Sequence, residues 1–218
     1  MSAVLTPKKT GKPAQKTASH NHQPDLPTMV VRLGPLKNRL TDDEFFEFCR
    51  QNRDLRIERT SEGEMIIMMP VGGEGSNRNF NLTGELAAWV KSDGTGVGFD
   101  SSAGFILPNG AERSPDAAWV RLDRWNAIPK KLRKKFPPIC PDFVVELRSE
   151  SDSLAELKTK LEEYIANGVQ LGWLIDPREK KVHIYRLGAE IEILDNPQTV
   201  SGDPLLKGFK LDLTSIFD

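Results

Sequence analysis

One acidic residue, Glu146, lies in the middle of the apolar run 143–147, which has the pattern of a strand buried on both faces. A carboxylate in such a strand is costly unless a cation binds it, so we expect either a metal ion or a buried salt bridge there. A second strand-like run, residues 114–120, carries another acid, Asp116, near its start. Two strand carboxylates and a nearby lysine are the smallest set of groups for magnesium-dependent cleavage of a phosphodiester bond.

A helix expected over residues 154–166 directly follows the strand of Glu146 and supplies the lysine. Its apolar side chains fall on one face at helical spacing, and that face is expected to pack on a sheet. Lys158 and Lys160 flank this face on opposite sides, and either could extend along the helix edge toward Glu146. Helical geometry does not choose between them, and each lysine could instead pair with a glutamate of its own helix.

Length and composition fit one domain with an extension, because the chain has 218 residues and a formal net charge of −1. Contact with nucleic acid would therefore depend on a local basic patch and not on the overall field. Cys49 and Cys140 are expected to be buried free thiols in a reducing compartment. With three histidines and two isolated cysteines, a zinc site of the His/Cys type is not expected.

No apolar run is long enough to span a bilayer, and the lysine-containing N-terminus lacks the apolar segment of a secretory signal, so a cytoplasmic location is expected. Residues 1–27 form a basic tail whose composition does not favour a folded core. It is either a solvated extension or an arm that contacts phosphates. We predict that the tail is dispensable for folding and that residues 28–218 form a single domain.

The order of elements predicts a mixed α/β fold. Thr41 and Glu44 form a capping box at the start of a short helix, and residues 55–69 have the pattern of a β-hairpin. A glycine-rich turn follows, and Ser76 is expected to cap the next helix, which Gly94 and Gly96 end. A meander, a strand, a helix and another strand come next. This order differs from the regular alternation of a doubly wound Rossmann fold.

An ordered set of short motifs resembles a known family. The set comprises Ser-Pro-Asp at 114–116, Pro-Asp-Phe-Val-Val-Glu at 141–146, Lys-x-x-x-Tyr at 160–164 and Gly-Trp-Leu-Ile-Asp-Pro at 172–177. Together they resemble the restriction-endonuclease family of Uma-two type, formerly a domain of unknown function, in the PD-(D/E)XK nuclease superfamily. The resemblance runs from about residue 40 to the C-terminus. It implies a restriction-endonuclease-like core, with a central mixed sheet flanked by helices and preceded by a helix and a hairpin.

Carried over residue by residue, the resemblance makes Asp116 and Glu146 the metal-binding carboxylates and Lys160 the catalytic lysine. In the superfamily pattern the lysine follows the second acid by two residues, but Arg148 stands at that position here. Arginine stays charged and binds anions through a planar fork, so Arg148 is a candidate phosphate contact. The Lys-x-x-x-Tyr spacing favours Lys160 over Lys158. Mg²⁺ is the expected cofactor, with Mn²⁺ as a substitute.

The resemblance also places a polar or acidic residue in the helix after the glycine-rich turn. Glu74 is our candidate, and Asn77, Asn79 and Glu85 remain open alternatives. A basic connector could contact the nucleic-acid backbone or simply face solvent; it contains Lys130, Lys131, Arg133, Lys134 and Lys135.

Four further groups are interpreted as structural. Asp142 begins its strand and Asp176 forms a turn, whereas His183 is expected at the surface or at a sheet edge. The aromatic residues Trp119, Trp173 and Tyr164 are expected in the core.

The sequence therefore predicts a metal-dependent nuclease whose expected substrate is DNA, although these residues do not distinguish DNA from RNA. Cleavage of both strands by related enzymes suggests a homodimer, by analogy of fold alone. The alternative is a catalytically inactive protein that keeps the fold and binds nucleic acid or a protein partner.

Overall fold

The computed structural model describes residues 29–31 and 40–218. Its central element is a six-stranded sheet. In spatial order its strands are β11 (Glu192–Asp195), β10 (Lys181–Arg186), β9 (Leu171–Asp176), β8 (Phe143–Leu147), β7 (Ala117–Arg121) and β4 (Gly96–Asp100). Strands β8 and β9 are parallel, and every other neighbouring pair in this sheet is antiparallel. The predicted tail, residues 1–27, lies outside the described residues.

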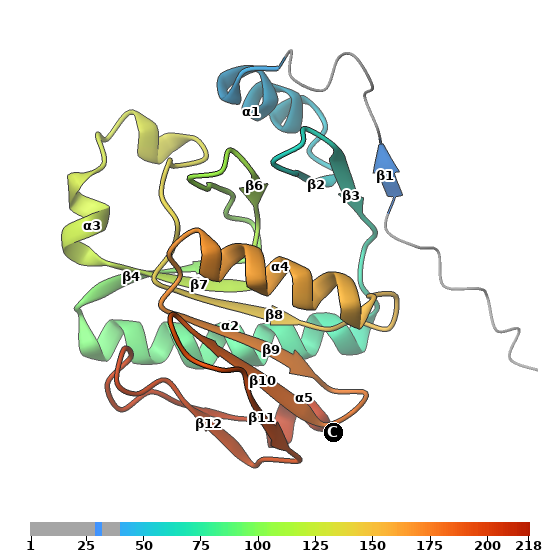
Figure 1. Cartoon of the computed structure of the whole chain (residues 1–218), viewed down its shortest axis with the longest axis vertical. Helices are drawn as coiled ribbons and strands as arrows, with labels where there is room; N and C mark the ends of the chain where they lie inside the picture. The colour runs from blue at the N-terminus through green and yellow to red at the C-terminus, as the bar shows by residue number, and fades with distance from the viewer. Residues whose placement is uncertain (1–28, 32–39) are drawn as a thin grey trace, which may run out of the picture.

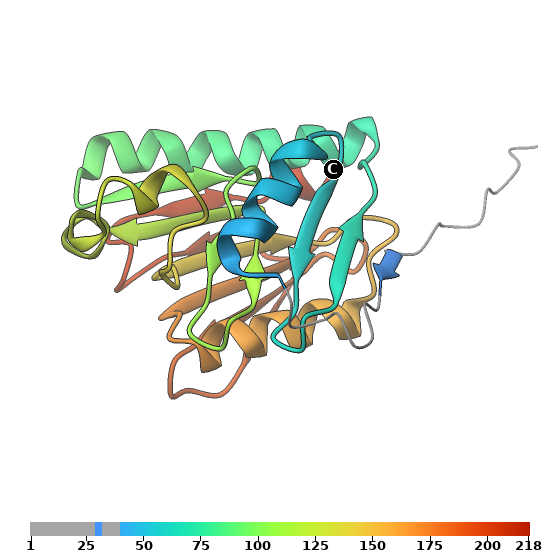
Figure 2. The ribbon, with the colours of Figure 1, turned by 90° about the horizontal axis from the view of Figure 1, so that it is seen from above.

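Two helices cover opposite faces of this sheet (Figures 1 and 2). They are α2 (Gly73–Asp93) and α4 (Leu154–Ala166). Because side chains alternate along a strand, Val145 joins the core under α2 and Val144 joins the core under α4. Glu146 therefore points to the α4 side of the sheet. Helix α4 also connects the parallel strands β8 and β9, so the chain itself fixes the helix beside Glu146.

A second sheet lies next to the end of the first and has five short strands (Figure 2). In spatial order these are β1 (Met29–Val31), β3 (Met65–Met68), β2 (Arg56–Arg59), β6 (Glu112–Arg113) and β5 (Phe105–Ile106). Helix α1 (Asp42–Gln51) packs on it through Phe45, which contacts Ile57 and Met65 in a small core. The predicted capping box is confirmed, since Thr41 and Glu44 each bond the other's backbone.

The described part of the chain contains further, shorter elements. They are α3 (Leu122–Ala127), a single 3₁₀ turn (Leu132–Lys134), the paired strands β12 (Thr199–Ser201) and β13 (Lys210–Asp212), and α5 (Thr214–Phe217). None of the helices in the described part of the chain has both the length and the apolar character to cross a bilayer.

Most of the predicted elements are confirmed, including the mixed α/β class, the strand 143–147, the helix 154–166 and the end of α2 at Gly94. The predicted cap at Ser76 is wrong. Helix α2 begins at Gly73, with Gly72 as an N-cap that offers no side chain, so Ser76 lies within the first turn.

Two burial predictions are also wrong. His183 is only 4% exposed, because β10 lies between β9 and β11 and α4 packs against it. Cys49 is only partly buried, whereas Cys140 is buried as expected; both are free thiols. The three aromatic residues expected in the core, Trp119, Trp173 and Tyr164, are buried.

The contact between β4 and β7 gives a test of packing. A Cβ atom on Gly96 would overlap the Trp119 indole and come within 2.5 Å of the Val120 carbonyl oxygen. We predict that Gly96→Ala lowers the free energy of unfolding by about 1–3 kcal/mol, because the backbone cannot move aside without breaking the strand pair. Urea denaturation of the wild type and the variant measures this difference in the free energy of unfolding.

The matched control is Gly84→Ala, in the interior of α2, where an added Cβ meets no atom within 4 Å. That variant should be about 0.5–1 kcal/mol more stable than the wild type, since alanine favours the helix. Equal stability of the two variants would contradict the packing argument.

Candidate active site

Asp116 and Glu146 lie side by side on neighbouring strands. Strand β7 pairs antiparallel with β8, and Ala117 faces Val145, so Asp116 adjoins Glu146 one position further along. Residues opposite each other on an antiparallel pair project from the same face of the sheet. The backbone N–H of Leu147 donates to Asp116 Oδ2 at 2.9 Å, which fixes the Asp116 carboxylate against the end of β8.

Glu146 is buried and is contacted by two side chains of α4. Lys160 Nζ lies 2.8 Å from Glu146 Oε1, and the Tyr164 hydroxyl donates to the same oxygen at 3.1 Å. Burial raises the pKa of Glu146 to about 7; Lys160 lowers it, and the negative charges of Asp116 and Glu58 raise it. Because the pKa of Glu146 lies close to neutrality, the charge of Glu146 depends on the groups that surround it.

Lys160 is held between two carboxylates. Its ammonium contacts Glu146 and also lies 2.9 Å from Glu58 Oε1, and only 12% of its side chain is exposed. Burial alone would lower the pKa of Lys160, but these two carboxylates outweigh it and raise the pKa, so the lysine keeps its charge. Lys158 is on the other side of α4, where its charge lowers the pKa of His183 after the larger effect of burial. The two lysines are thus separated as the predicted helix required.

The exposed side of Asp116 opens into a cleft of about 750 Å³. Arg56 Nη1 lies 3.2 Å from Asp116 Oδ1, and Arg56 Nη2 donates to the Ser114 carbonyl at 2.6 Å. Arg56 lines the same cleft, as do Arg78 and the first turn of α2. The cleft therefore presents basic and acidic groups together at the edge of the sheet.

Arg148 is engaged in a structural ion pair. Its guanidinium lies 2.7 Å from Oδ2 of Asp176, which is completely buried, and it also donates to the Asp152 carbonyl. Asp176 forms the expected turn as well, because its Oδ1 accepts the backbone N–H groups of Arg178 and Glu179. Arg148 lines the cleft, but its guanidinium is already paired with the Asp176 carboxylate. Its predicted contact with phosphate stays a prediction.

The candidates for a polar residue on α2 separate clearly. Glu74 and Asn79 line the cleft with Asp116, and the Glu74 side chain is 91% exposed, 3.9 Å from Arg78. Glu85 instead accepts the backbone N–H of Asp212 and ties α2 to the C-terminal hairpin. Asn77 accepts a bond from Asn81 within the helix and does not line the cleft.

Asp142 and two residues of the basic connector make structural contacts. Asp142 is buried, binds Arg124 at 2.8 Å and accepts the backbone N–H of Arg121, in keeping with a strand-start role. In the basic connector, Arg133 donates to the carbonyl groups of Ile128 and Asn126, and Lys135 pairs with Asp43. The connector residues do not line the cleft.

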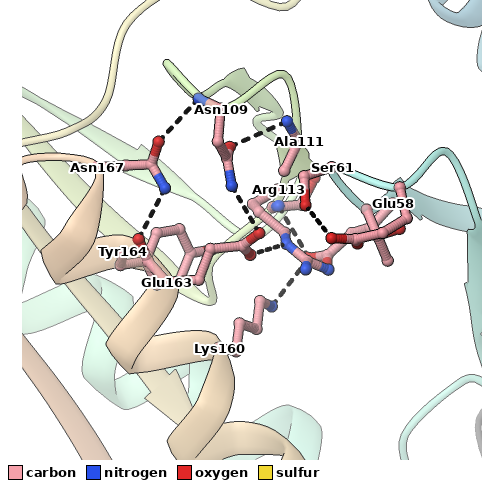
Figure 3. Close-up of polar contacts among 12 residues, drawn as sticks. Glu58, Ser61, Asn109, Ala111, Arg113, Lys160, Glu163, Tyr164 and Asn167 are labelled. Carbon is pink, nitrogen blue, oxygen red and sulfur yellow. Dashed lines mark hydrogen bonds and ion pairs between the residues drawn. The ribbon is translucent and has the colours of Figure 1, made fainter.

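Sequence reasoning missed two residues of the site, Arg56 and Glu58. Both lie on β2, and strand alternation places them on the same face, opposite to Ile57. Glu58 is 2% exposed and contacts Arg113 and Lys160 in the network drawn in Figure 3. The signal available in the sequence was a pair of opposite charges at alternate positions of one strand. Arg56 is the cationic partner of Asp116, and Glu58 is the anionic partner of Lys160.

The donor set suits a hard cation only with help from other oxygens. Within residues 29–31 and 40–218, no group of three or more His, Cys, Asp and Glu side chains is arranged to hold a metal ion. Asp116 and Glu146 offer carboxylate oxygens alone, which is the ligand chemistry of Mg²⁺, an ion that keeps several of its waters. The donor chemistry of the two residues therefore suits a magnesium ion that keeps several waters.

The pair between Arg148 and Asp176 yields a stability prediction. Replacing Arg148 with Met leaves the Asp176 carboxylate buried without its cation, so we expect a loss of about 3–5 kcal/mol in unfolding free energy. Arg178→Met is the control, because Arg178 is 42% exposed and 3.7 Å from Glu150; it should cost less than about 1 kcal/mol. Chemical denaturation of both variants measures the difference, and similar losses would show that the buried pair is not structural.

Comparisons with known proteins identify a family and a structure of similar fold. Residues 42–214 match the family model described as "Uma2: Putative restriction endonuclease". The structure is similar to the crystal structure of a putative nuclease belonging to DUF820 from Anabaena variabilis ATCC 29413, with a TM-score of 0.64 and 24% sequence identity. That likeness covers 82% of this chain and 97% of the other, and it shows a restriction-endonuclease-like fold. Among curated proteins none matches the sequence. The family model spans most of the chain, including Asp116, Glu146 and Lys160, and the protein belongs to the Uma2 family of putative restriction endonucleases.

Proposed function

We propose that this protein is a metal-dependent nuclease that hydrolyses phosphodiester bonds in nucleic acid, with DNA as the expected substrate. The observation that supports this most is the meeting of three groups. Asp116 and Glu146 adjoin each other on paired strands, and Lys160 Nζ is 2.8 Å from Glu146 at the same point. A cleft of about 750 Å³ opens beside Asp116.

In this proposal Asp116 and Glu146 hold Mg²⁺. Two adjacent carboxylates repel each other, and Asp116 is one of the charges that raise the pKa of Glu146, so a cation beside them would relieve the repulsion. When bound, the ion would supply a Lewis acid that activates water and offsets charge on the phosphate.

Lys160 would act through its charge. A preorganised ammonium in a site with little water stabilises the negative charge that develops on a phosphate in the transition state. Lys160 meets these conditions, since only 12% of its side chain is exposed and two carboxylates keep it protonated. Arg56 and Arg78, which line the cleft, would contact the sugar-phosphate backbone and orient the strand.

A second candidate function is supported by the contact between Arg56 and Asp116. Arg56 already pairs with Asp116, and Lys160 pairs with Glu146, so each of these acids has a cationic partner without added metal. This favours the alternative of a catalytically inactive protein that keeps the fold and binds nucleic acid or a partner.

The test is cleavage of supercoiled plasmid, single-stranded DNA and RNA with Mg²⁺ or Mn²⁺, against a chelator control. We predict metal-dependent cleavage that falls about 10²–10³-fold in Lys160→Ala and as strongly in Asp116→Asn, because each removes a preorganised electrostatic group. Lys158→Ala is the matched control and should stay close to wild type, since Lys158 is on the other side of α4.

Full activity of Lys160→Ala would refute the role of this lysine. A wild-type protein that cleaves no substrate with any metal, yet shifts nucleic acid in a gel, would favour the binding protein instead. The molar mass in solution, measured with and without DNA, would test the proposed homodimer.

A further inference from the structure

The buried carboxylate of Glu58 belongs to the small sheet but meets the site built on the large one. Glu58 Oε1, on β2 of the small sheet, lies 2.9 Å from Lys160 Nζ, and Glu146 Oε1, on β8 of the large sheet, lies 2.8 Å from the same nitrogen. Glu58 is 2% exposed. In Figure 3 the Lys160 side chain leaves α4 and extends toward Glu58 and Arg113. The lysine is therefore held from two sheets at once.

Glu58 is itself fixed by three donors. The backbone N–H of Ser114 donates to Oε1 at 2.9 Å, Arg113 Nη1 lies 3.1 Å from Oε2, and Lys160 completes the set. Arg113 in turn binds Glu163 of α4 at 2.6 Å. Lys160 and Arg113 lower the pKa of Glu58 despite the opposing effect of burial, so the carboxylate is charged. Glu58 is thus a rigid anion at a defined place.

A fixed anion of this kind can hold the Lys160 ammonium in one position. A lysine side chain has a flexible four-carbon stem and a single point charge, so its position depends on its partners. Glu146 is a poor sole partner, because the proposed metal would compete for its charge. Glu58 is not one of the proposed metal ligands and remains available when Glu146 is engaged.

We propose that Glu58, fixed by Arg113 and the Ser114 backbone, is a positioning residue that holds the Lys160 ammonium beside Glu146 for contact with the scissile phosphate. This inference rests on the proposed nuclease function. In this proposal the β2–β3 hairpin supports catalysis by positioning Lys160, and Glu58 makes no direct contact with the reacting atoms.

The first experiment is Glu58→Gln, which keeps the shape and the acceptor for Ser114 but removes the charge. We predict that kcat falls about 10²-fold, the loss typical of a misplaced catalytic group, while KM for DNA changes less than about threefold. Glu62→Gln is the matched control, an exposed acid on the same hairpin, and should leave both constants unchanged. Unchanged kcat in Glu58→Gln would overturn the proposal.

A double-mutant cycle separates positioning from a general effect on the fold. If Glu58 acts through Lys160, Glu58→Gln should cause no further loss of activity in a Lys160→Ala background. A full additional loss in that background would show that Glu58 acts by another route. Glu58→Asp provides a variant that keeps the charge and so protects folding; it should recover part of the lost kcat.

A readout that needs no cleavage distinguishes failure of this proposal from failure of the nuclease function. Peptide-resolved mass spectrometry can follow acetylation of Lys160, with Lys158 as the reference within the same helix. Glu58→Gln should raise the modification of Lys160 severalfold and leave Lys158 unchanged. Unchanged labelling of Lys160 would overturn the positioning role. Raised labelling in a protein without nuclease activity would reject the proposed function and retain the contact between Glu58 and Lys160.

Discussion

The burial of one carboxylate, Glu146, is the constraint on which the arrangement of this protein depends. An ionised carboxyl group between a sheet and a helix is strongly unfavourable unless charged or hydrogen-bonding groups surround it. Lys160 and Tyr164 of α4 supply those groups, but they reach Glu146 only because the helix directly connects β8 to β9. The crossover helix therefore has two roles: it covers the apolar face of the sheet, and it brings a cation to the acid that interrupts that face.

A single lysine between two buried acids requires further charges, and these extend to the small sheet. Glu58 brings a second negative charge to Lys160, Arg113 balances Glu58, and Glu163 balances Arg113. Each group is buried or largely buried next to a partner of opposite sign, which is the condition under which buried charges are tolerated. The network joins β2, β6 and α4, so the position of the hairpin relative to the large sheet depends on polar contacts as well as on apolar packing.

Much of this could be predicted because the signals are local. The strand of Glu146, the amphipathic helix after it and the capping box at Thr41 each depend on neighbouring residues, and the structure contains all three. The choice of the catalytic lysine required more than helical periodicity, since Lys158 and Lys160 both flank the apolar face of the helix, one on each side. Glu58 was missed, because its signal in the sequence, charged residues at alternate positions of a strand, usually indicates a strand face exposed to solvent. The Arg113 side chain of β6, the neighbouring strand, and the Lys160 side chain of α4 contact Glu58 and bury it, and packing of α4 against β10 likewise buries His183.

The contact between Glu58 and Lys160 joins residues 102 positions apart in the chain. Such a contact forms only after most of the intervening polypeptide has folded, because closing a long loop is entropically costly until other interactions restrain its ends. Helix α4 and the strands around it are linked by a short connection, whereas the hairpin must dock from a distant part of the chain. The charged groups of the site are therefore assembled only when both sheets are folded and docked. A molecule whose small sheet has opened locally would keep its central sheet and lose the arrangement of these groups.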